Sequence, residues 1–572
     1  MGEKKWKASC KSSEASKIEQ LARNARIPRP IACYLTARGI DADAAGGFLN
    51  PRLSSLSDPY RFRDIQKAAA RIWDAIYRQE PILIHGDYDT DGITGTALLG
   101  NVLRQNGAKV FPFIPHRFDD GYGFTPESLD KALASSGENC RLLVTVDCGI
   151  TSCDAVAKAG SLGIDTIITD HHEPGPELPD AVAVINPKTD PALEDLNILA
   201  GAGTAFKLAH AFIKYGRENN LGGFTTRLEE VLDFVALGTV ADIVPLTGEN
   251  RILVRAGIGT LRRQIRPGVR ALIESCRLHN EIVPSDITFK LAPRINAAGR
   301  VGDANIALRL LESENIVEAY GFAAKLEEFN HTRQMLEQEI YQEARARIAG
   351  DFDPDKNFVI LVAGNNWHQG VIGIVASRLA RDYNRPAVVL TIDGESAYGS
   401  GRSVGNLNLV DVLASTSGCL NRFGGHPMAV GIGLEASKIE DFKKELEKCV
   451  RDKIRLEELE EFIAYDGDAA IGEFDGAFFD SLELLGPFGH SMPKPVFRIN
   501  EVEVLRSSPV GQKHLRGVFR DSRGSTMDFI AFSVDSEKFR GRFFDVLAVP
   551  QINTFGGTSR PQLSVIDIKP VY

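Results

Sequence analysis

The sequence predicts a multidomain α/β protein that ends in a small all-β domain, and three observations indicate this class. From Pro81 onward, short apolar strand-like runs alternate with helical stretches, which is typical of a parallel sheet with helices on both faces. After residue 351 a second alternation begins with FVILVAG, a helix through IGIVASRLARDY, and PAVVLTI. Beyond residue 463 the chain contains five strand-like runs separated by turn residues, which suit a small barrel.

The length of 572 residues exceeds what one hydrophobic core usually serves, so several domains are expected. The stretch before Asp74 is apolar-periodic and helical in pattern, and the segment from Gly302 to Ala349 has the apolar spacing of a long helix or helix pair. The five parts we expect are an N-terminal helical segment (1–75), an α/β domain (76–300), a connector helix (301–350), a second α/β domain (351–462) and an OB-like β-barrel (463–572).

Composition narrows the class of protein but leaves its partner open. With 43% hydrophobic and 25% charged residues the chain has an ordinary globular composition, and we find neither an apolar run near the roughly 18 residues of a membrane span nor a secretory leader. Eight scattered cysteines with no CxxC pair indicate reduced thiols. We therefore expect a cytoplasmic protein without a membrane partner. The net charge of −10 does not suggest nucleic-acid binding, although basic contacts can be local.

Three alternating aspartates, Asp87, Asp89 and Asp91, stand in HGDYDTDG directly after the apolar run ILI. Like charges this close repel, and burial increases the repulsion, so a bound cation is the expected reason for them. An EF-hand is excluded, because its twelfth position would be Leu98 instead of Glu and a strand precedes the loop. A simple Asp-Gly turn with a helix cap remains the alternative for this motif alone.

Other polar residues follow apolar runs in the same domain, and ligands of open α/β sheets bind outside the carboxyl ends of the strands. We expect these residues to converge on one edge, where carboxylates with some imidazole suit two Mn²⁺ or Mg²⁺ ions. No GxxxxGK[ST] loop and no complete GxGxxG is present, which disfavours NTPase and dinucleotide-binding functions. The residues at these ends are His85, Asp89 and Asp91 after ILI, Asp147 after LLVTV, Asp170, His171 and His172 after TIIT, and Asp242 after VALGTVA.

The DHH phosphoesterase superfamily has four motifs that resemble HGDYDTDG, VDCG, TDHHEPG and GTVADIVPL. Its RecJ branch, the single-strand-specific 5′→3′ exonucleases, has motifs similar to LAPRINAAGR, WHQGVIGIVASRLA, GSGRSVGNLNL and FGGHPMAVG, the last of which also resembles the DHHA1 domain. The resemblance runs from about Trp6 to the C-terminal strands. It implies a DHH catalytic domain, a DHHA1 domain and an OB-like nucleic-acid-binding domain, which together degrade single-stranded DNA to 5′-mononucleotides in DNA repair and recombination.

The resemblance also implies roles for individual residues. His172 would contact the scissile phosphate, Asp170 would orient a histidine, and Asp87 would belong to the same catalytic group. For any one arginine the alternative is an ion pair, and for His426 it is a buried core histidine. The implied metal ligands are His85, Asp89, Asp91, Asp147, His171 and Asp242. The implied 5′-phosphate pocket is Arg117, Ser400 and Arg402. The expected DNA contacts are Arg294, Asn296, Arg300, His426, Lys513 and Arg516, with His514 and Arg520 on the same strand.

One turn departs from the family, because PFGHSMPKPVF stands where PFGxGNPxPxF is usual, which puts the turn geometry in question. Two other functions remain as alternatives: a DHH phosphatase or phosphodiesterase acting on short oligonucleotides or cyclic dinucleotides, and a non-catalytic replication scaffold. The strand-like C-terminal region argues against the first, and the complete set of expected ligands argues against the second. Partners implied by the resemblance alone are a single-strand-binding protein and a RecQ-type helicase, and a monomer is expected.

Overall fold

The structure is a computed structural model that describes residues 5–571 except 118–119, 122, 137–138, 280, 351, 456–458, 460–461, 512–513, 533–538, 540 and 556–557. The chain forms two compact bodies. One contains Asp58–Asp242 and Gly257–Glu461, and the other contains the chain up to Ser57, Ile243–Ala256 and the part from Phe462 onward. No helix among the described residues is long and apolar enough to cross a membrane.

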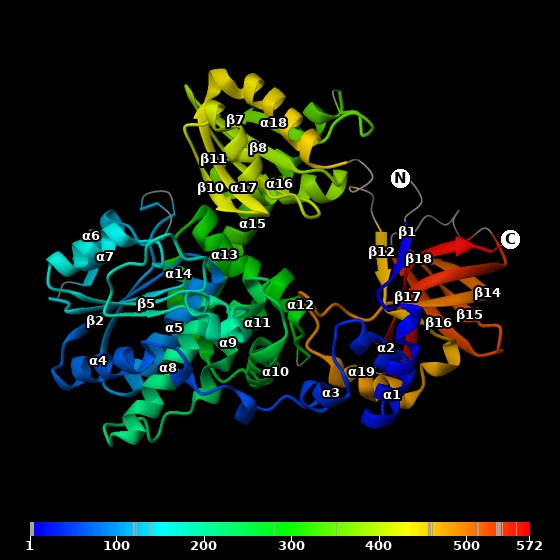
Figure 1. The fold of residues 1–572 in the computed structure, drawn as a ribbon, viewed down its shortest axis with the longest axis horizontal. Helices are drawn as coiled ribbons and strands as arrows, with labels where there is room; N and C mark the ends of the chain where they lie inside the picture. Colours follow the sequence, from blue (N-terminus) through cyan, green and yellow to red (C-terminus); the bar gives the residue numbers. More distant parts are fainter. Residues whose placement is uncertain are drawn as a thin grey trace. The chain divides into compact units, whose positions relative to one another are not determined.

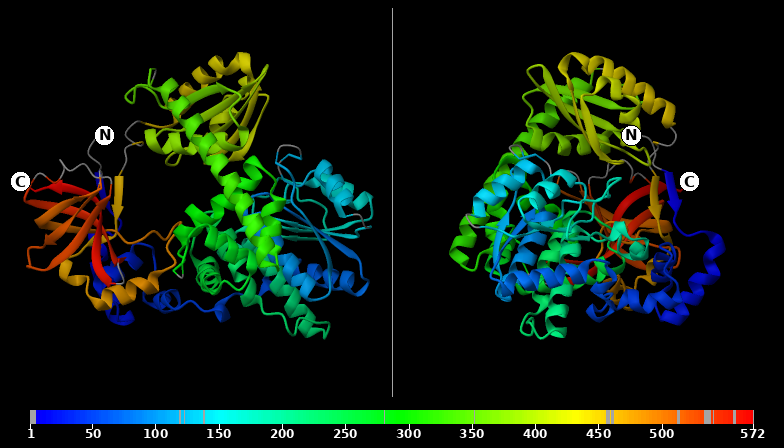
Figure 2. Two further views of the ribbon diagram at one scale, coloured as in Figure 1. Left: turned by 180° about the vertical axis from the view of Figure 1, so that it is seen from behind. Right: turned by 60° about the vertical axis from the view of Figure 1, so that its left-hand side comes forward.

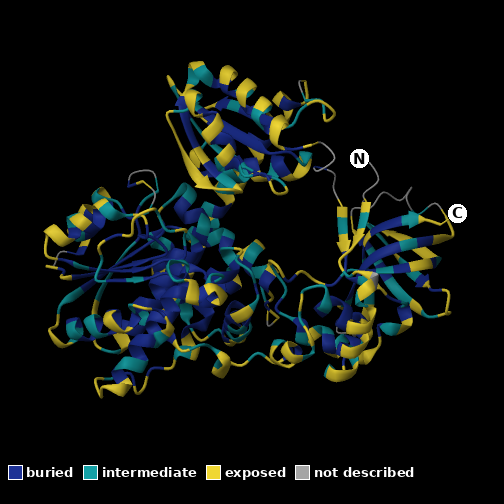
Figure 3. Ribbon diagram, in the orientation of Figure 1, coloured by how far each residue is buried: buried dark blue, intermediate teal, exposed yellow. Residues whose placement is uncertain are grey.

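The first body contains the predicted parallel sheet, with strand order β3-β2-β4-β5-β6. Its central strands are almost entirely buried and appear dark blue in Figure 3, because helices cover both faces and leave no polar side. Helices α6 and α7 lie on one face, and α4, α5 and α8 lie on the other (Figure 1). The strands are β2 Pro81–Gly86, β3 Lys109–Phe113, β4 Leu142–Val146, β5 Asp165–Thr169 and β6 Ala183–Ile185; the helices are α4 Ile65–Tyr77, α5 Thr90–Gln105, α6 Pro126–Ser136, α7 Cys153–Ser161 and α8 Gly201–Glu218.

A helical region follows this sheet and leads to a 33-residue helix, α15, which fulfils the expectation of a connector (Figure 2). Near its start α15 packs on α11, α13 and α14, and towards its end it packs on α16 and β7. The helices are α9 Leu232–Ala241, α10 Gly248–Arg263, α11 Pro267–Ser275, α12 Pro284–Asp286, α13 Ala292–Val301, α14 Asn305–Glu312 and α15 Ile316–Ile348, with a π-helical turn at Ile287–Leu291 before α13.

One expectation is wrong in this region: Asp242 does not follow a strand. VALGTVA lies in α9, and Asp242 is the residue that caps the end of this helix. Residues Leu232 to Val240 are all buried, so the helix has no polar face. A helix that is apolar all round shows no 3.6-residue period, and a short apolar run of this kind cannot be distinguished from a buried strand by its pattern.

The second α/β domain of this body has strand order β10-β11-β9-β8-β7, with β7 and β8 parallel and the other neighbours antiparallel. Helix α16 packs on one face of this sheet, and α17 and α18 pack on the other. The elements are β7 Ile360–Asn365, α16 Gln369–Tyr383, β8 Ala387–Asp393, β9 Ser396–Arg402, α17 Leu409–Ser415, β10 Arg422–His426, β11 Ala429–Glu435 and α18 Ile439–Lys453.

The second body contains the five predicted C-terminal strands in the order β14-β15-β16-β18-β17. A further pairing of β14 with β17 joins the two ends of this order, so the strands close on themselves as in an OB-fold. Apolar residues of α1, α2 and α3 share their core with the barrel and α19. The elements are β1 Lys5–Ala8, α1 Ala15–Ala25, α2 Arg29–Thr36, α3 Ala42–Leu49, β12 Phe462–Tyr465, β13 Gly467–Asp468, α19 Gly476–Leu485, β14 Phe497–Val510, β15 His514–Arg520, β16 Thr526–Phe532, β17 Phe543–Phe555 and β18 Thr558–Pro570.

The turn that departs from the family pattern closes as a tight hairpin. The backbone N–H groups of Gly489 and Met492 each donate to the other residue's carbonyl, at 2.9 and 3.1 Å. Ser491 takes the left-handed conformation, with φ +60°. The backbone carbonyl of His490 accepts a hydrogen bond from the N–H of Leu246, which belongs to the same body.

Candidate metal centre

The loop that follows β2 turns directly into α5 and presents its aspartates at the carboxyl edge of the sheet. Asp89 is the N-cap of α5, and its Oδ1 accepts hydrogen bonds from the N–H groups of Asp91 and Gly92. Asp91 accepts hydrogen bonds from the N–H groups of Gly201, at 2.6 Å, and Ala202, at 2.9 Å. These two donors form the start of α8, whose partial positive charge favours a carboxylate there.

Asp147 follows β4 and is turned towards the same edge by an uncommon backbone conformation. Its φ is +62°, in the left-handed region that aspartate tolerates better than most residues, and its N–H donates to the carbonyl of Thr169 at 2.9 Å. A Cβ on Gly201 would lie 2.4 Å from Asp147 Oδ1, so only glycine allows α8 to approach this carboxylate so closely. Asp147 is thus held in place while its Oδ1 makes no hydrogen bond.

Asp170 follows β5 and holds both histidines of the DHH sequence. Its Oδ1 accepts hydrogen bonds from the backbone N–H groups of His171 (2.7 Å) and His172 (3.1 Å), and its Oδ2 accepts one from Ile150 N–H. The same Oδ1 lies 2.7 Å from Nδ1 of His172. Burial works against a charge on this imidazole, but the hydrogen bond and charge of Asp170 prevail and raise the pKa of His172 to about 9. His172 is therefore protonated at neutral pH.

His171 occupies the centre of the carboxylates that come from separate parts of the chain. Its Nε2 lies 3.2 Å from Asp147 Oδ1, 3.6 Å from Asp242 Oδ2 and 3.9 Å from Asp91 Oδ2. Among the described residues, three sets have ligand atoms close enough together to hold a cation. They are Asp147, His171 and His172; Asp91, His171 and Asp242; and Asp87, Asp89 and Asp147.

The carboxylates of these sets lack the positive charge that they need to be ionised, and a bound cation would supply it. Burial, and after it the charges of neighbouring aspartates, raises the pKa of Asp87 to about 8, of Asp91 to about 7 and of Asp242 to about 9. The same causes raise the pKa of Asp147 well above its ordinary value. Oδ1 of Asp87, like that of Asp147, is buried without a hydrogen-bond partner in the described part of the chain. Buried carboxylate oxygens without donors are expected where a metal ion supplies the missing positive charge.

His85 is the one predicted ligand that the structure leaves outside these three sets. Its ring is fully buried between Phe113 and Phe124, with Nε2 3.0 Å from Ser128 Oγ and Nδ1 3.8 Å from the sulfur of Cys148. Burial lowers the pKa of His85 to about 4, so the ring is neutral and a nitrogen lone pair is available. Its role as a ligand stays a prediction.

The residues predicted to bind a terminal phosphate lie in the same body as the carboxylates. Arg402 Nη1 donates to Ser400 Oγ at 2.9 Å, and the guanidinium of Arg117 lies 5.2 Å from the ring centre of Tyr88. Burial and then the charge of Arg117 lower the pKa of Arg402, and the same two causes lower the pKa of Arg300 to about 10. Among the described residues, no ion pair involves any of these three arginines.

The other predicted DNA contacts differ in their surroundings. The ring of His426 lies nearly parallel to that of His172, with centres 6.1 Å apart. Arg294 forms an ion pair with Glu327, and Oδ1 of Asn296 accepts hydrogen bonds from the N–H and hydroxyl of Thr90, so both have local structural partners. Arg516 lies on β15 and lines a cavity on the barrel, and Arg520 is paired with Glu503. Lys513 lies outside the described residues.

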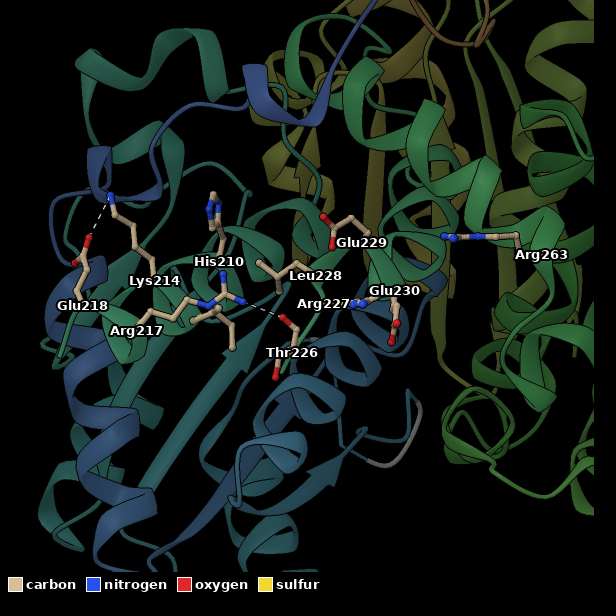
Figure 4. Close-up of a pocket in the computed structure, with 11 residues that line it drawn as sticks. His210, Lys214, Arg217, Glu218, Thr226, Arg227, Leu228, Glu229, Glu230 and Arg263 are labelled. Carbon is tan, nitrogen blue, oxygen red and sulfur yellow. Dashed lines mark hydrogen bonds and ion pairs between the residues drawn. The ribbon is translucent and has the colours of Figure 1, made fainter. Parts of the chain in front are cut away.

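A separate cavity of about 740 Å³ lies beside α8 and the segment after it, as Figure 4 shows. Two of its cationic side chains already have partners: Arg217 donates to the carbonyls of Gly223 and Thr226, and Lys214 contacts Asp58 and Glu218. It contains none of the predicted site residues. We therefore place the functional site at the carboxylates and not in this cavity.

Sequence reasoning missed several groups that hold the site together. The backbone N–H groups of Gly201 and Ala202 hold Asp91, the amide of Asn186 donates to the carbonyl of His172, and Ser128 contacts His85. Backbone donors leave no side-chain pattern. The run AGAGT at the start of α8 was the available signal, because small residues at a helix start permit close approach.

Family models match three segments of the chain: the DHH family N-terminal domain over residues 81–239, the DHHA1 domain over 355–452, and the RecJ OB domain over 465–567. The single-stranded-DNA-specific exonuclease RecJ of Bacillus subtilis (strain 168) is 35% identical over 563 residues, which cover 97% of this chain and 70% of that protein. The Escherichia coli (strain K12) exonuclease of the same name is 36% identical over 532 residues, with 89% and 90% covered. A crystal structure of Thermus thermophilus RecJ in complex with Mn²⁺ matches with a TM-score of 0.82 and 28% identity, covering 98% of this chain and 78% of that one.

The parallel sheet with its carboxylate and histidine edge, joined to a DHHA1 domain, defines a protein of the DHH class. Its C-terminal domain is of the RecJ OB type, and its curated relatives are similar along almost the whole chain. The chain belongs to the RecJ family.

Proposed function

We propose that this protein is a metal-dependent exonuclease that degrades single-stranded DNA from the 5′ end and releases 5′-mononucleotides in DNA repair and recombination. The relatives named single-stranded-DNA-specific exonuclease support the substrate and the reaction class. The observation that carries the proposal is that one body contains two clusters of opposite charge, each without enough counter-charges of its own. Buried carboxylates without enough cations lie at the sheet edge, and Arg117, Arg300 and Arg402 crowd together without carboxylate partners in the described part of the chain.

A DNA 5′ end could contact both clusters, with its terminal phosphate at the arginines and the next phosphate at the metal site. The arginines repel one another, and a terminal phosphate between Arg117, Ser400 and Arg402 would remove that repulsion. The protonated His172 would donate from Nε2 to the scissile phosphate, because Nδ1 is occupied by Asp170. With one phosphate in the arginine pocket and the next at His172, only the terminal nucleotide lies between the two groups. This arrangement would release mononucleotides.

The carboxylate sets and His171 would hold two Mn²⁺ or Mg²⁺ ions, the metals named for the Thermus thermophilus RecJ structures. When bound, such ions activate water and stabilise the leaving oxygen of a phosphodiester. The chain itself positions the ligands: Asp91 on the start of α8, Asp147 against Gly201, and His171 through Asp170. Asp89 and Asp242 would complete the sets, with His85 as a further ligand.

In this proposal residues 76–300 carry the chemistry, residues 351–462 contribute Ser400, Arg402 and His426, and residues 463–572 hold the strand. Arg516 belongs to a cavity of about 610 Å³ on the barrel that also contains Arg506 and Arg560, and these cationic side chains suit the phosphates of a single strand. We infer a cytoplasmic location, since all eight cysteines are free thiols, and we propose that the protein is a monomer. A single-strand-binding protein and a RecQ-type helicase are its proposed partners.

Single-turnover cleavage of 5′-phosphorylated and 5′-hydroxyl single strands tests the phosphate pocket. We expect the 5′-phosphorylated strand to be cleaved at least tenfold faster by the wild type. We expect Arg402→Ala to remove this preference, because it slows cleavage of the phosphorylated strand and leaves the hydroxyl strand, which has no terminal phosphate for the arginine to bind, unchanged. Arg381→Ala, at an exposed arginine of α16, is the matched control and should keep the preference. Equal rates on both strands for the wild type would contradict the proposal.

A further inference from the structure

The face of the second sheet that bears α16 is only partly covered by that helix. Alternation along β9 places Tyr398, Ser400 and Arg402 on this face, and the strand register places glycines beside two of them. Ser400 is aligned with Gly431 on β11 and Gly424 on β10, and the next aligned set, about 7 Å further along, is Tyr398, Gly433 and Arg422. Arg402 aligns in the same way with Ala429 and His426.

The side chains of Tyr398 and Arg422 meet across β11. The guanidinium of Arg422 lies 5.4 Å from the ring centre of Tyr398. A Cβ on Gly433 would lie 2.9 Å from Arg422 Cγ, so the arginine stem crosses the bare backbone of Gly433 to reach the ring. Arg422 is exposed, and this ring contact is its interaction within the described part of the chain. A half-buried tyrosine and an exposed guanidinium thus form one flat, cationic aromatic surface.

We propose that Tyr398 and Arg422 stack against the base of the 5′-terminal nucleotide, the one that is released. This inference rests on the proposed function, because it takes Ser400 and Arg402 as the 5′-phosphate pocket and His426 with His172 as the position of the scissile phosphate. The nucleoside between those two phosphates then lies over β11. Its base reaches the Tyr398–Arg422 surface across Gly431 and Gly424, where an added Cβ would meet no atom closer than 4.0 Å.

The chemistry of the surface suits any nucleobase. Every base has a π-face, and stacking on an aromatic ring with an arginine beside it tolerates all sequences. Neither residue offers an arrangement of donors and acceptors that would select one base edge. A stacking surface of this kind would strengthen binding of the terminal nucleotide without making cleavage depend on its base.

The test compares wild type, Tyr398→Ala and Arg422→Ala on 5′-phosphorylated single strands whose first nucleotide, second nucleotide or neither is abasic. We expect both variants to lose about tenfold in kcat/KM on the complete strand and on the strand abasic at position 2. On the strand abasic at position 1 they should equal the wild type, because no base is there to stack. Arg381→Ala should behave as wild type throughout.

A second readout does not depend on cleavage: calorimetric binding of 2′-deoxyadenosine 5′-monophosphate and of 2-deoxyribose 5-phosphate. Wild type should prefer the nucleotide, and Tyr398→Ala should bind both alike, whereas Tyr398→Phe should keep the preference. If DNA is not cleaved but this preference behaves as described, the proposed function fails and the stacking proposal stands. Cleavage defects that follow the base at position 2, or variants that match Arg381→Ala, would overturn the stacking proposal.

Discussion

At the scale of single residues, the site is a set of carboxylates whose charged form is disfavoured by the surrounding fold. Burial and mutual repulsion raise the pKa values of Asp87, Asp91, Asp147 and Asp242. Asp170 is the exception: burial opposes its charge, but hydrogen bonds from His172 and from backbone N–H groups lower its pKa. This difference in pKa distinguishes the carboxylate that orients a histidine from the four that would bind a cation.

The change Asp170→Asn tests this division at the residue scale. Without the carboxylate, the two largest influences that raise the pKa of His172, the hydrogen bond and the charge of Asp170, are lost, so the imidazolium loses its proton at lower pH. We expect kcat to fall by about 10- to 100-fold and the alkaline limb of the kcat–pH profile to move to lower pH. Asp154→Asn, at an exposed aspartate of α7, is the control and should leave the profile unchanged. An alkaline limb that stays in place in the Asp170→Asn profile would show that Asp170 does not set the charge of His172.

At the scale of elements, the sequence could predict which strand ends carry polar residues but not how helix starts support them. ILI, LLVTV and TIIT are strands in the structure, as alternation with helices indicated, so Asp89, Asp147 and His171 could be expected at one edge. The burial of α9 on all sides hid its period, and the backbone donors at the start of α8 have no side-chain pattern. Hydrophobic periodicity reveals an element that has one apolar and one polar face. A helix that is buried on all sides and a pair of backbone N–H groups have no such faces.

Gly201→Ala tests the close approach of α8 to Asp147. The new methyl group would lie 2.4 Å from Asp147 Oδ1 and must displace the carboxylate. We expect the Mn²⁺ concentration for half-maximal activity to rise at least tenfold while the fold is kept, because alanine favours a helix. Gly160→Ala in α7, where a Cβ meets nothing within 4 Å, is the matched control. An unchanged Mn²⁺ requirement would mean that Asp147 can move without loss of the site.

At the scale of the whole molecule, the closed barrel and the two α/β domains were predictable from alternation and strand count. The association of the N-terminal helices with the barrel was not. Residues Ile31 and Leu35 share a core with Phe478 and Phe497, and β1 pairs in parallel with β12. Such packing joins segments more than 400 residues apart in the sequence, and an amphipathic helix does not specify which distant surface covers its apolar face.

The carboxylate cluster makes the stability of the whole protein depend on pH and metal. In chelator, the folded state keeps protons on Asp87, Asp91 and Asp242 above pH 4, where the unfolded state has lost them, so the free energy of unfolding falls as pH rises towards 8. Each extra proton contributes about 1.4 kcal/mol per pH unit. We expect Tm in chelator to be lower at pH 8 than at pH 6, and Mn²⁺ to raise Tm more at pH 8. Asp147→Asn should flatten the slope; a wild-type Tm that rises between pH 6 and 8 in chelator would contradict this.

The most direct test of the central claim is degradation of single-stranded DNA labelled at either the 5′ or the 3′ end. The reactions contain Mn²⁺, Mg²⁺ or chelator, beside a blunt duplex, a dinucleotide and the variant Asp147→Ala. We expect immediate release of the 5′ label as a mononucleotide, dependent on metal and absent with the duplex and with the variant. Cleavage of the dinucleotide alone would instead indicate a small-substrate phosphodiesterase. Binding of DNA with no cleavage of any substrate would indicate a scaffold.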